Sequence, residues 1–96
     1  MKENPELTEA QLARAIPVQA LRRLLRGTFE TAEDIRTLRR YLGLTQVLLA
    51  RAMGVSVHTL RNWEQGRRVP EGPALALLRI AARHPHVLRE RVDAAA

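Results

Sequence analysis

Apolar side chains recur at helical spacing along most of the chain, and glycines and prolines separate the resulting segments. The first segment runs from Thr8 to Ile16, and Pro17 separates it from a second segment that Gly27 ends. The second segment places leucines on one face and arginines on the other, which predicts an amphipathic helix. We expect residues 1–28 to form a helical arm and residues 29–96 to form the main domain.

The main domain begins with a helix whose two ends are marked in the sequence. Thr31 is a good N-cap, and the acidic residues Glu33 and Asp34 in the first turn suit the positive end of the helix dipole. Gly43 is the expected stop. The buried stripe of this helix should comprise Ile35, Leu38 and Leu42.

Two short helices joined by one tight turn should follow. Thr45 can cap a helix that runs through Met53, and Gly54 breaks it. Ser56 can cap the next helix, which runs through Gln65 before another glycine. A cluster of glycine and proline at residues 70–73 then precedes a strongly apolar helix, and Pro85 starts a last helical segment. No strand-like alternation is present, so the predicted fold class is all-α.

Residues 45–65 have the pattern of a helix-turn-helix. This motif needs a small residue where its helices cross, a glycine at the turn and buried aliphatic side chains, and Ala50, Gly54 and Leu60 occupy such places. Helical spacing turns Leu60 and Trp63 inward together, so we interpret Trp63 as a core residue. The outward face of the second helix carries the candidate base-contacting residues Val57, His58, Arg61 and Asn62.

Polar residues near the starts of the two motif helices are candidates for phosphate contacts. Backbone N–H groups and the helix dipole favour an anion at a helix N-terminus. Residues that we expect at these positions are Thr45, Gln46, Ser56 and Thr59.

Composition supports a duplex nucleic acid as the partner. Lysine and arginine number 16 against 10 acidic residues, so the formal net charge is +6. Aromatic residues are only 3% of the chain, too few for the stacking surfaces of single-strand binders. The chain has no cysteine, and His84 and His86 lack further ligands, so we expect no metal and no cofactor.

No nucleophile paired with a base and no phosphate-binding glycine loop is visible, so an enzyme is the weakest interpretation. The chain also lacks an apolar run long enough to span a membrane and an apolar segment behind its N-terminus. We therefore expect a cytoplasmic, nucleoid-associated protein.

The run from Leu44 to Gly66, LTQVLLARAMGVSVHTLRNWEQG, resembles the helix-turn-helix of the Xre family, which is named after phage Cro and cI repressors. Together with the motifs PEGPA and LLRIAARHP it is similar to the antitoxins of the HigA and MqsA type, especially the NadS-like regulators. This resemblance implies a five-helix, lambda-repressor-like domain. It also implies a homodimer on a palindromic operator that represses its own operon, and a partner toxin that is usually a messenger-RNA-cleaving ribonuclease.

The resemblance assigns roles to individual residues. The family's phosphate-contacting glutamine corresponds to Gln46, and its base-contacting positions correspond to Val57, His58 and Asn62, with Arg61 beside them. The basic loop after the second motif helix corresponds to Arg67 and Arg68, which should contact phosphate. The ion pair beneath the motif corresponds to Arg39 and Glu64, which we interpret as structural rather than catalytic.

The chain also departs from its relatives. MqsA antitoxins carry a zinc-binding N-terminal domain, for which a chain without cysteine has no replacement. Val47 and Leu48 stand where relatives usually have polar residues, which is either a protein contact or an accident of composition. The leucines of the arm need a partner surface, and the sequence leaves three open: the chain's own core, the dimer mate or the toxin. The same question applies to Val87, Leu88 and Val92.

Two other functions remain open at this point. One is a transcriptional repressor of the same fold without a toxin. The other is a helical adaptor that binds a protein partner while its basic charge is incidental.

Overall fold

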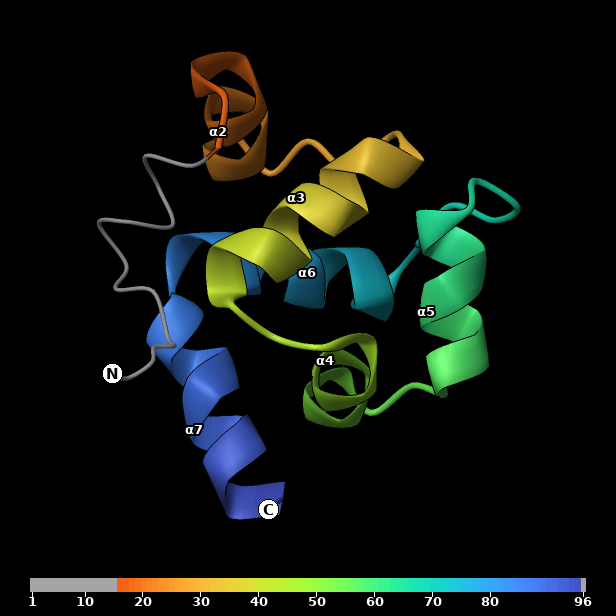
Figure 1. The fold of residues 1–96 in the computed structure, drawn as a ribbon, viewed down its shortest axis with the longest axis vertical. Helices are drawn as coiled ribbons and strands as arrows, with labels where there is room; N and C mark the ends of the chain where they lie inside the picture. The colour runs from red at the N-terminus through yellow and green to blue at the C-terminus, as the bar shows by residue number, and fades with distance from the viewer. Residues whose placement is uncertain (1–15, 96) are drawn as a thin grey trace, which may run out of the picture.

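The computed structural model describes the backbone of residues 16–95 and the side chains of residues 16–92, and every regular element in this part is a helix (Figure 1). In chain order these are α2 (Val18–Leu25), α3 (Ala32–Leu42), α4 (Gln46–Met53), α5 (Val57–Glu64), α6 (Pro73–Arg83) and α7 (Pro85–Ala95). The expected all-α class, an arm helix followed by five helices, is confirmed. The predicted helix from Thr8 lies, up to residue 15, outside the described residues.

Local capping signals define the helix ends. The Thr31 side chain accepts a hydrogen bond from the backbone N–H of Asp34, whose carboxylate accepts one in return from the backbone N–H of Thr31. Gly43 and Gly54 end α3 and α4 in the left-handed conformation, with φ of 71° and 74°. The left-handed Gly54 lets the chain reverse between α4 and α5 within a short turn.

The core is built around one deeply buried leucine from each described helix. These are Leu24, Leu38, Leu49, Leu60, Leu78 and Leu88. Truncating a leucine in such a core typically costs about 2 to 5 kcal/mol. Leu88 therefore belongs to the chain's own core, while Val87 on the same helix remains exposed.

Helix α4 lies between α5 and α7 and contacts both of them, and α6 crosses the centre of the molecule above α4 in this view (Figure 1). Helix α7 is anchored to α4 by Arg91, whose Nε donates to the carbonyl oxygen of Ala52 at 3.0 Å. Helix α5 packs on α3 and α4 and forms one side of the molecule in this view. The side of α5 that faces away from α3 and α4 is thereby left open.

The arm helix α2 packs on this chain's own α3 and α6. Arg23 donates from Nε and Nη2 to the two carboxylate oxygens of Asp34, each at 2.8 Å. Arg79 donates from Nε to the carbonyl oxygen of Gly27 at 2.9 Å. Of the three partner surfaces left open for the arm, the described part thus uses its own core, whereas Leu25 stays exposed. The division of the chain at residue 28 remains a prediction.

Asp34 is the acidic centre of this contact. Burial alone would raise the pKa of Asp34, but the Arg23 guanidinium and the backbone N–H groups of Glu30 and Thr31 outweigh it and lower the pKa to about 2. The ordinary value is 3.8. The ionised form therefore stabilises the fold above the ordinary pKa, and this stabilisation is lost as the pH falls towards about 2.

Replacing Asp34 with Asn should lower the free energy of unfolding at neutral pH by about 2 kcal/mol, because each pKa unit corresponds to about 1.4 kcal/mol. The difference between wild type and variant should shrink as the pH falls from about 5 to about 2. Urea denaturation followed by circular dichroism across this range measures both. Glu33→Gln is the control: this side chain is 56% exposed and its ion pairs should contribute little. A difference that is independent of pH would contradict the assignment.

Candidate nucleic-acid interface

Helices α4 and α5 form a helix-turn-helix unit whose inward face is apolar. Leu49 and Met53 of α4 and Leu60 and Trp63 of α5 are all buried. Ala50, the small residue expected at the crossing, is also buried. These side chains hold the two helices against the core, so the outward sides of the two helices are available for a partner.

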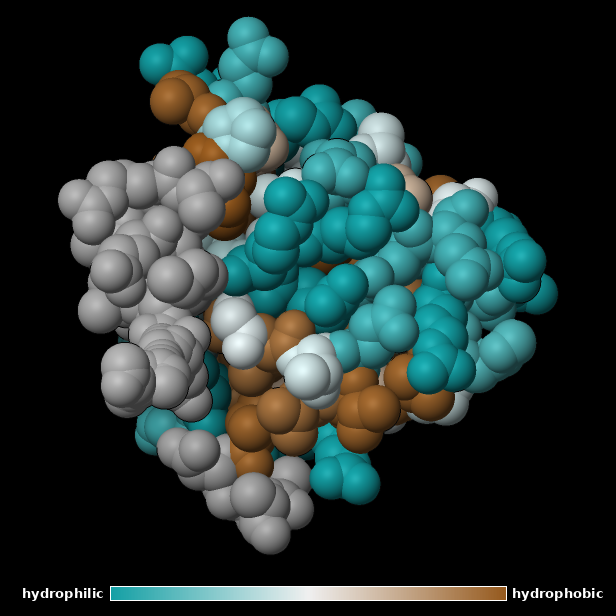
Figure 2. Space-filling model, viewed as in Figure 1, coloured by the Kyte–Doolittle hydropathy of each residue, from teal (hydrophilic) through white to brown (hydrophobic). Residues whose placement is uncertain are grey.

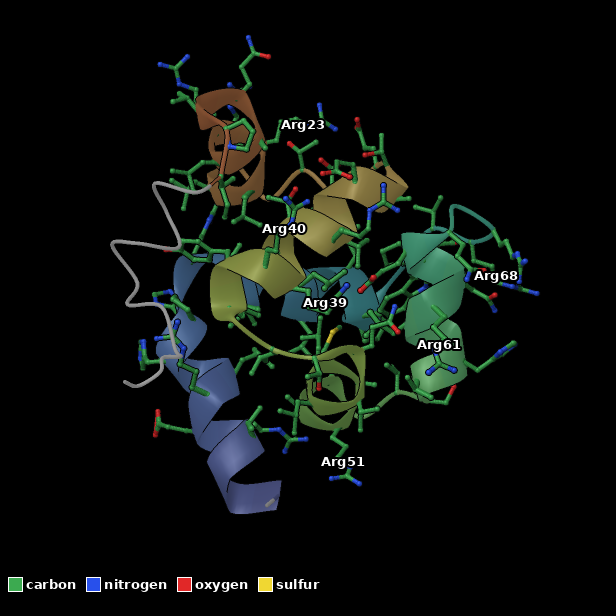
Figure 3. All side chains as sticks on the ribbon, in the orientation of Figure 1. Arg23, Arg39, Arg40, Arg51, Arg61 and Arg68 are labelled. Atoms are coloured by element: carbon green, nitrogen blue, oxygen red, sulfur yellow. The ribbon has the colours of Figure 1, made fainter. Side chains whose placement is uncertain are left out.

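The predicted base-contacting residues share this outward face of α5. His58 and Arg61 are exposed, whereas Val57 and Asn62 are half-buried, and Val57 packs against the edge of the core. In Figure 3 Arg61 lies in front of α5 in this view, and Arg68 projects from the loop that follows this helix. The face thus combines two exposed polar side chains with two that are half-buried.

The hydroxyl groups predicted to contact phosphate also cap the helices. Thr45 Oγ1 accepts from the N–H of Leu48 at 3.1 Å, and Ser56 Oγ accepts from the N–H of Thr59 at 3.0 Å. The Ser56 and Thr59 hydroxyls are 3.0 Å apart. One of these two hydroxyls donates to the other, and the remaining hydroxyl hydrogen can still donate to a phosphate, so capping and phosphate binding are compatible.

The loop after α5 is anchored through its backbone. The N–H groups of Arg67 and Arg68 donate to the carbonyl oxygen of Asn62 at 2.9 and 3.4 Å, and Gly66 takes a positive φ of 75°. Both arginine side chains are exposed. The loop therefore presents two positive charges from a fixed backbone at the end of the motif.

An ion pair between a half-buried arginine and a buried glutamate connects the motif to α3. Arg39 donates from Nε to Glu64 Oε2 at 2.7 Å and from Nη2 to Oε1 at 3.0 Å, and the Glu64 side chain is only 3% exposed. Gln46 Nε2 donates to the same Oε1 at 3.1 Å. Because the carboxylate of Glu64 is fully engaged and buried, a structural role accounts for it without any acid–base chemistry.

Sequence reasoning missed two of the contacts around this ion pair. Arg36 donates from Nη1 to the carbonyl oxygen of Glu64 and thereby satisfies a carbonyl at the end of α5. The sequence spacing could have predicted this contact, because Arg36 precedes Arg39 by one helical turn and shares its face of α3. The second is the hydrogen bond from Arg61 Nε to Gln46 Oε1, at 3.3 Å.

Apolar and polar surfaces adjoin at the motif. In Figure 2 a hydrophobic area covers the region of α4, and the surface over α5 beside it is mainly hydrophilic. Val47 of α4 is 44% exposed, while Leu48 is half-buried. Of the two residues that depart from the family pattern, Val47 therefore contributes more to the surface.

Within the described residues, no group of three or more histidine, aspartate or glutamate side chains is arranged to hold a metal ion. His84 and His86 stack edge to face with ring centroids 6.1 Å apart. Among the described helices, none combines the length and the apolar character that a membrane crossing requires.

The described part of the protein is all-α, and the arrangement of α4, the turn and α5 is that of a helix-turn-helix. Over residues 4–91 the chain matches the family described as the antitoxin component of a bacterial toxin-antitoxin system, MqsA. The chain therefore belongs to this family of antitoxins. It is also 41% identical over 56 residues to the antitoxin HigA-2 of Vibrio cholerae. That alignment covers 58% of this chain and 54% of the relative, so the chain spans about half of that protein's length.

Replacing Arg39 with Met should lower the free energy of unfolding by about 3 kcal/mol, because it leaves the Glu64 carboxylate buried without its cation. The double variant Arg39→Met, Glu64→Met should lose less than this single variant, since no uncompensated charge remains. Urea denaturation of the two variants and the wild type provides the comparison. If the single variant were as stable as the wild type, the ion pair would not be the structural link described above.

Proposed function

We propose that this antitoxin is a sequence-specific, double-stranded DNA-binding repressor. It acts as a homodimer on a palindromic operator, represses its own operon and neutralises a messenger-RNA-cleaving toxin. The observation that carries the DNA-binding part is the open face of α5, with His58 and Arg61 exposed between the capped helix starts and the basic loop. Membership of the antitoxin family supports the toxin part.

The geometry of α5 suits the major groove. A groove about 12 Å wide admits one α-helix, and side chains on its outward face then reach the base edges. The half-buried Asn62 can still present its amide, which pairs with the N6 and N7 edge of adenine. Val57 offers an apolar contact of the kind that a thymine methyl group accepts.

Phosphate contacts should fix the register of the helix in the groove. The caps Thr45 and Ser56 place hydroxyls at the N-termini of α4 and α5, where N–H groups and helix dipoles favour phosphate. Arg67 and Arg68 add charge at the other end of α5. Contacts on both sides of the recognition helix hold it without specifying the sequence.

A dimer explains why a palindrome is the expected operator. Two copies related by a two-fold axis place their recognition helices about 34 Å apart, one turn of the duplex, in successive major grooves. Ile80 on α6 and Val87 on α7 are apolar and exposed, so the chain retains apolar surface outside the motif for a second copy. The repressor is therefore proposed to act as a symmetric pair.

Binding to the promoter region of its own operon should be specific and strongly dependent on salt. Affinity should fall by about 100-fold or more between about 50 and 200 mM salt, because phosphate neutralisation releases counterions. Fluorescence anisotropy with operator and random duplexes measures both properties. An affinity that does not change with salt, or an equal affinity for both duplexes, would contradict the proposal of sequence-specific DNA binding.

Two variants separate the roles within this experiment. Asn62→Ala should relax the preference at one base pair of each half-site by about 1 to 3 kcal/mol. Arg67→Ala should instead weaken operator and random DNA alike and reduce the salt dependence. If the two variants lost affinity for operator and random DNA to the same extent, this division between base and phosphate contacts would be wrong.

The toxin part of the proposal is tested by the product of the neighbouring gene. Co-expression should give a complex that purifies through a tag on this chain and should suppress ribonuclease activity of the neighbour. The Arg67→Ala variant is the matched control, because it should lose DNA affinity and keep the toxin complex. A neighbour without ribonuclease activity, or one that does not co-purify, would favour a repressor without a toxin.

A further inference from the structure

A continuous series of hydrogen bonds runs from α3 to the outward face of α5. It begins at Arg39 on α3, whose guanidinium holds both oxygens of the buried Glu64 carboxylate. Glu64 Oε1 accepts from Gln46 Nε2 at 3.1 Å, and Gln46 Oε1 accepts from Arg61 Nε at 3.3 Å. These hydrogen bonds thus link three helices and end on an exposed arginine.

The ionised carboxylate determines which way the Gln46 amide points. A carboxylate only accepts hydrogen bonds, so the amide nitrogen, not the amide oxygen, must face Glu64. Glu64 cannot turn away, because its side chain is 3% exposed and both of its oxygens are held by Arg39. The Gln46 oxygen is therefore left to face Arg61 as a fixed acceptor.

This acceptor engages only one nitrogen of Arg61. Among the described residues, Nη1 and Nη2 of Arg61 have no hydrogen-bond partner. Their parallel N–H groups form the planar fork that matches O6 and N7 of guanine in the major groove, the commonest specific contact of an arginine. An arginine held at Nε also loses less side-chain freedom on binding than an unrestrained one.

We propose that Gln46 is a positioning residue that orients Arg61, and that the Nη1 and Nη2 groups of Arg61 read a guanine in each half-site. This inference rests on the DNA binding proposed above. It gives Gln46 a role in specificity, in contrast to the purely phosphate-binding role that the family resemblance implies. The Arg39–Glu64 pair then contributes to sequence recognition through Gln46.

A double-mutant cycle tests the coupling between the two residues. Gln46→Met keeps the length of the side chain and removes both hydrogen bonds, while Arg61→Lys keeps the charge and removes the fork and the Nε contact. Affinities are measured for the operator and for a set of duplexes in which each base pair of the half-site is replaced in turn. Arg61→Lys identifies the guanine, as the position where discrimination is lost.

At this base pair Gln46→Met should reduce discrimination by about 10-fold, which corresponds to about 1.4 kcal/mol of a bidentate contact. In the Arg61→Lys background it should cause no further loss of discrimination at that pair. Arg67→Ala is the matched control, and its effect should be uniform across the duplexes and additive with Arg61→Lys. Because Gln46 contacts a buried carboxylate, thermal unfolding of each variant is recorded, and Gln46→Asn, too short to span both partners, replaces any Gln46→Met protein that fails to fold.

Two results would overturn the inference. One is a loss for Gln46→Met that is equal on every duplex and unchanged by Arg61→Lys, which is the behaviour of a phosphate contact alone. The other is an Arg61→Lys protein that retains every base preference. Both results are interpreted only when the wild-type protein distinguishes operator from random DNA. A wild-type protein that does not distinguish them would contradict the proposed function itself.

Discussion

The structure of the motif depends on one buried carboxylate. Glu64 lies at the end of α5, and it is held by Arg39 from α3 and by Gln46 from the first turn of α4. An ionised carboxylate without partners costs several kcal/mol in a protein interior. None of the three helices can therefore rotate or slide without leaving this charge unpaired. The angle at which α5 is presented is set by that constraint.

Apolar packing and polar contacts have different tasks in this small domain. Burial of Leu38, Leu49, Leu60 and Leu78 supplies free energy, but it is not directional and tolerates small shifts between helices. The hydrogen bonds of Glu64 have narrow limits of distance and angle. The same holds for the contacts of Asp34, which join the arm helix α2 to α3. Leucines thus make the fold stable, and the two carboxylates define how its helices are placed.

Features that depend on neighbouring residues were predictable from the sequence, and features that depend on helix crossing were not. Thr31, Thr45 and Ser56 as caps and Gly43 and Gly54 as stops follow from local chemistry, and the structure confirms them. The bond between Gln46 and Arg61 joins residues 15 positions apart on different helices. Glycine, proline and periodicity carry no information about such a pair. Asp34 shows the same limit: its place in the first turn was predicted, but its partner Arg23 was not.

The ion pairs are distributed unevenly over the surface of the molecule. The acidic residues at the start of α3 are engaged: Glu33 pairs with Arg36 and Arg40, and Asp34 pairs with Arg23. Between residues 45 and 68 the single acidic residue is the buried Glu64, whereas Arg51, Arg61, Arg67 and Arg68 are exposed. Four of the six arginines between residues 18 and 42 thus have an ion-pair partner, whereas the four exposed arginines of the motif have none among the described residues. The unpaired arginines of the motif attract a polyanion to this part of the surface, so electrostatic attraction and the open helix face favour the same docking direction.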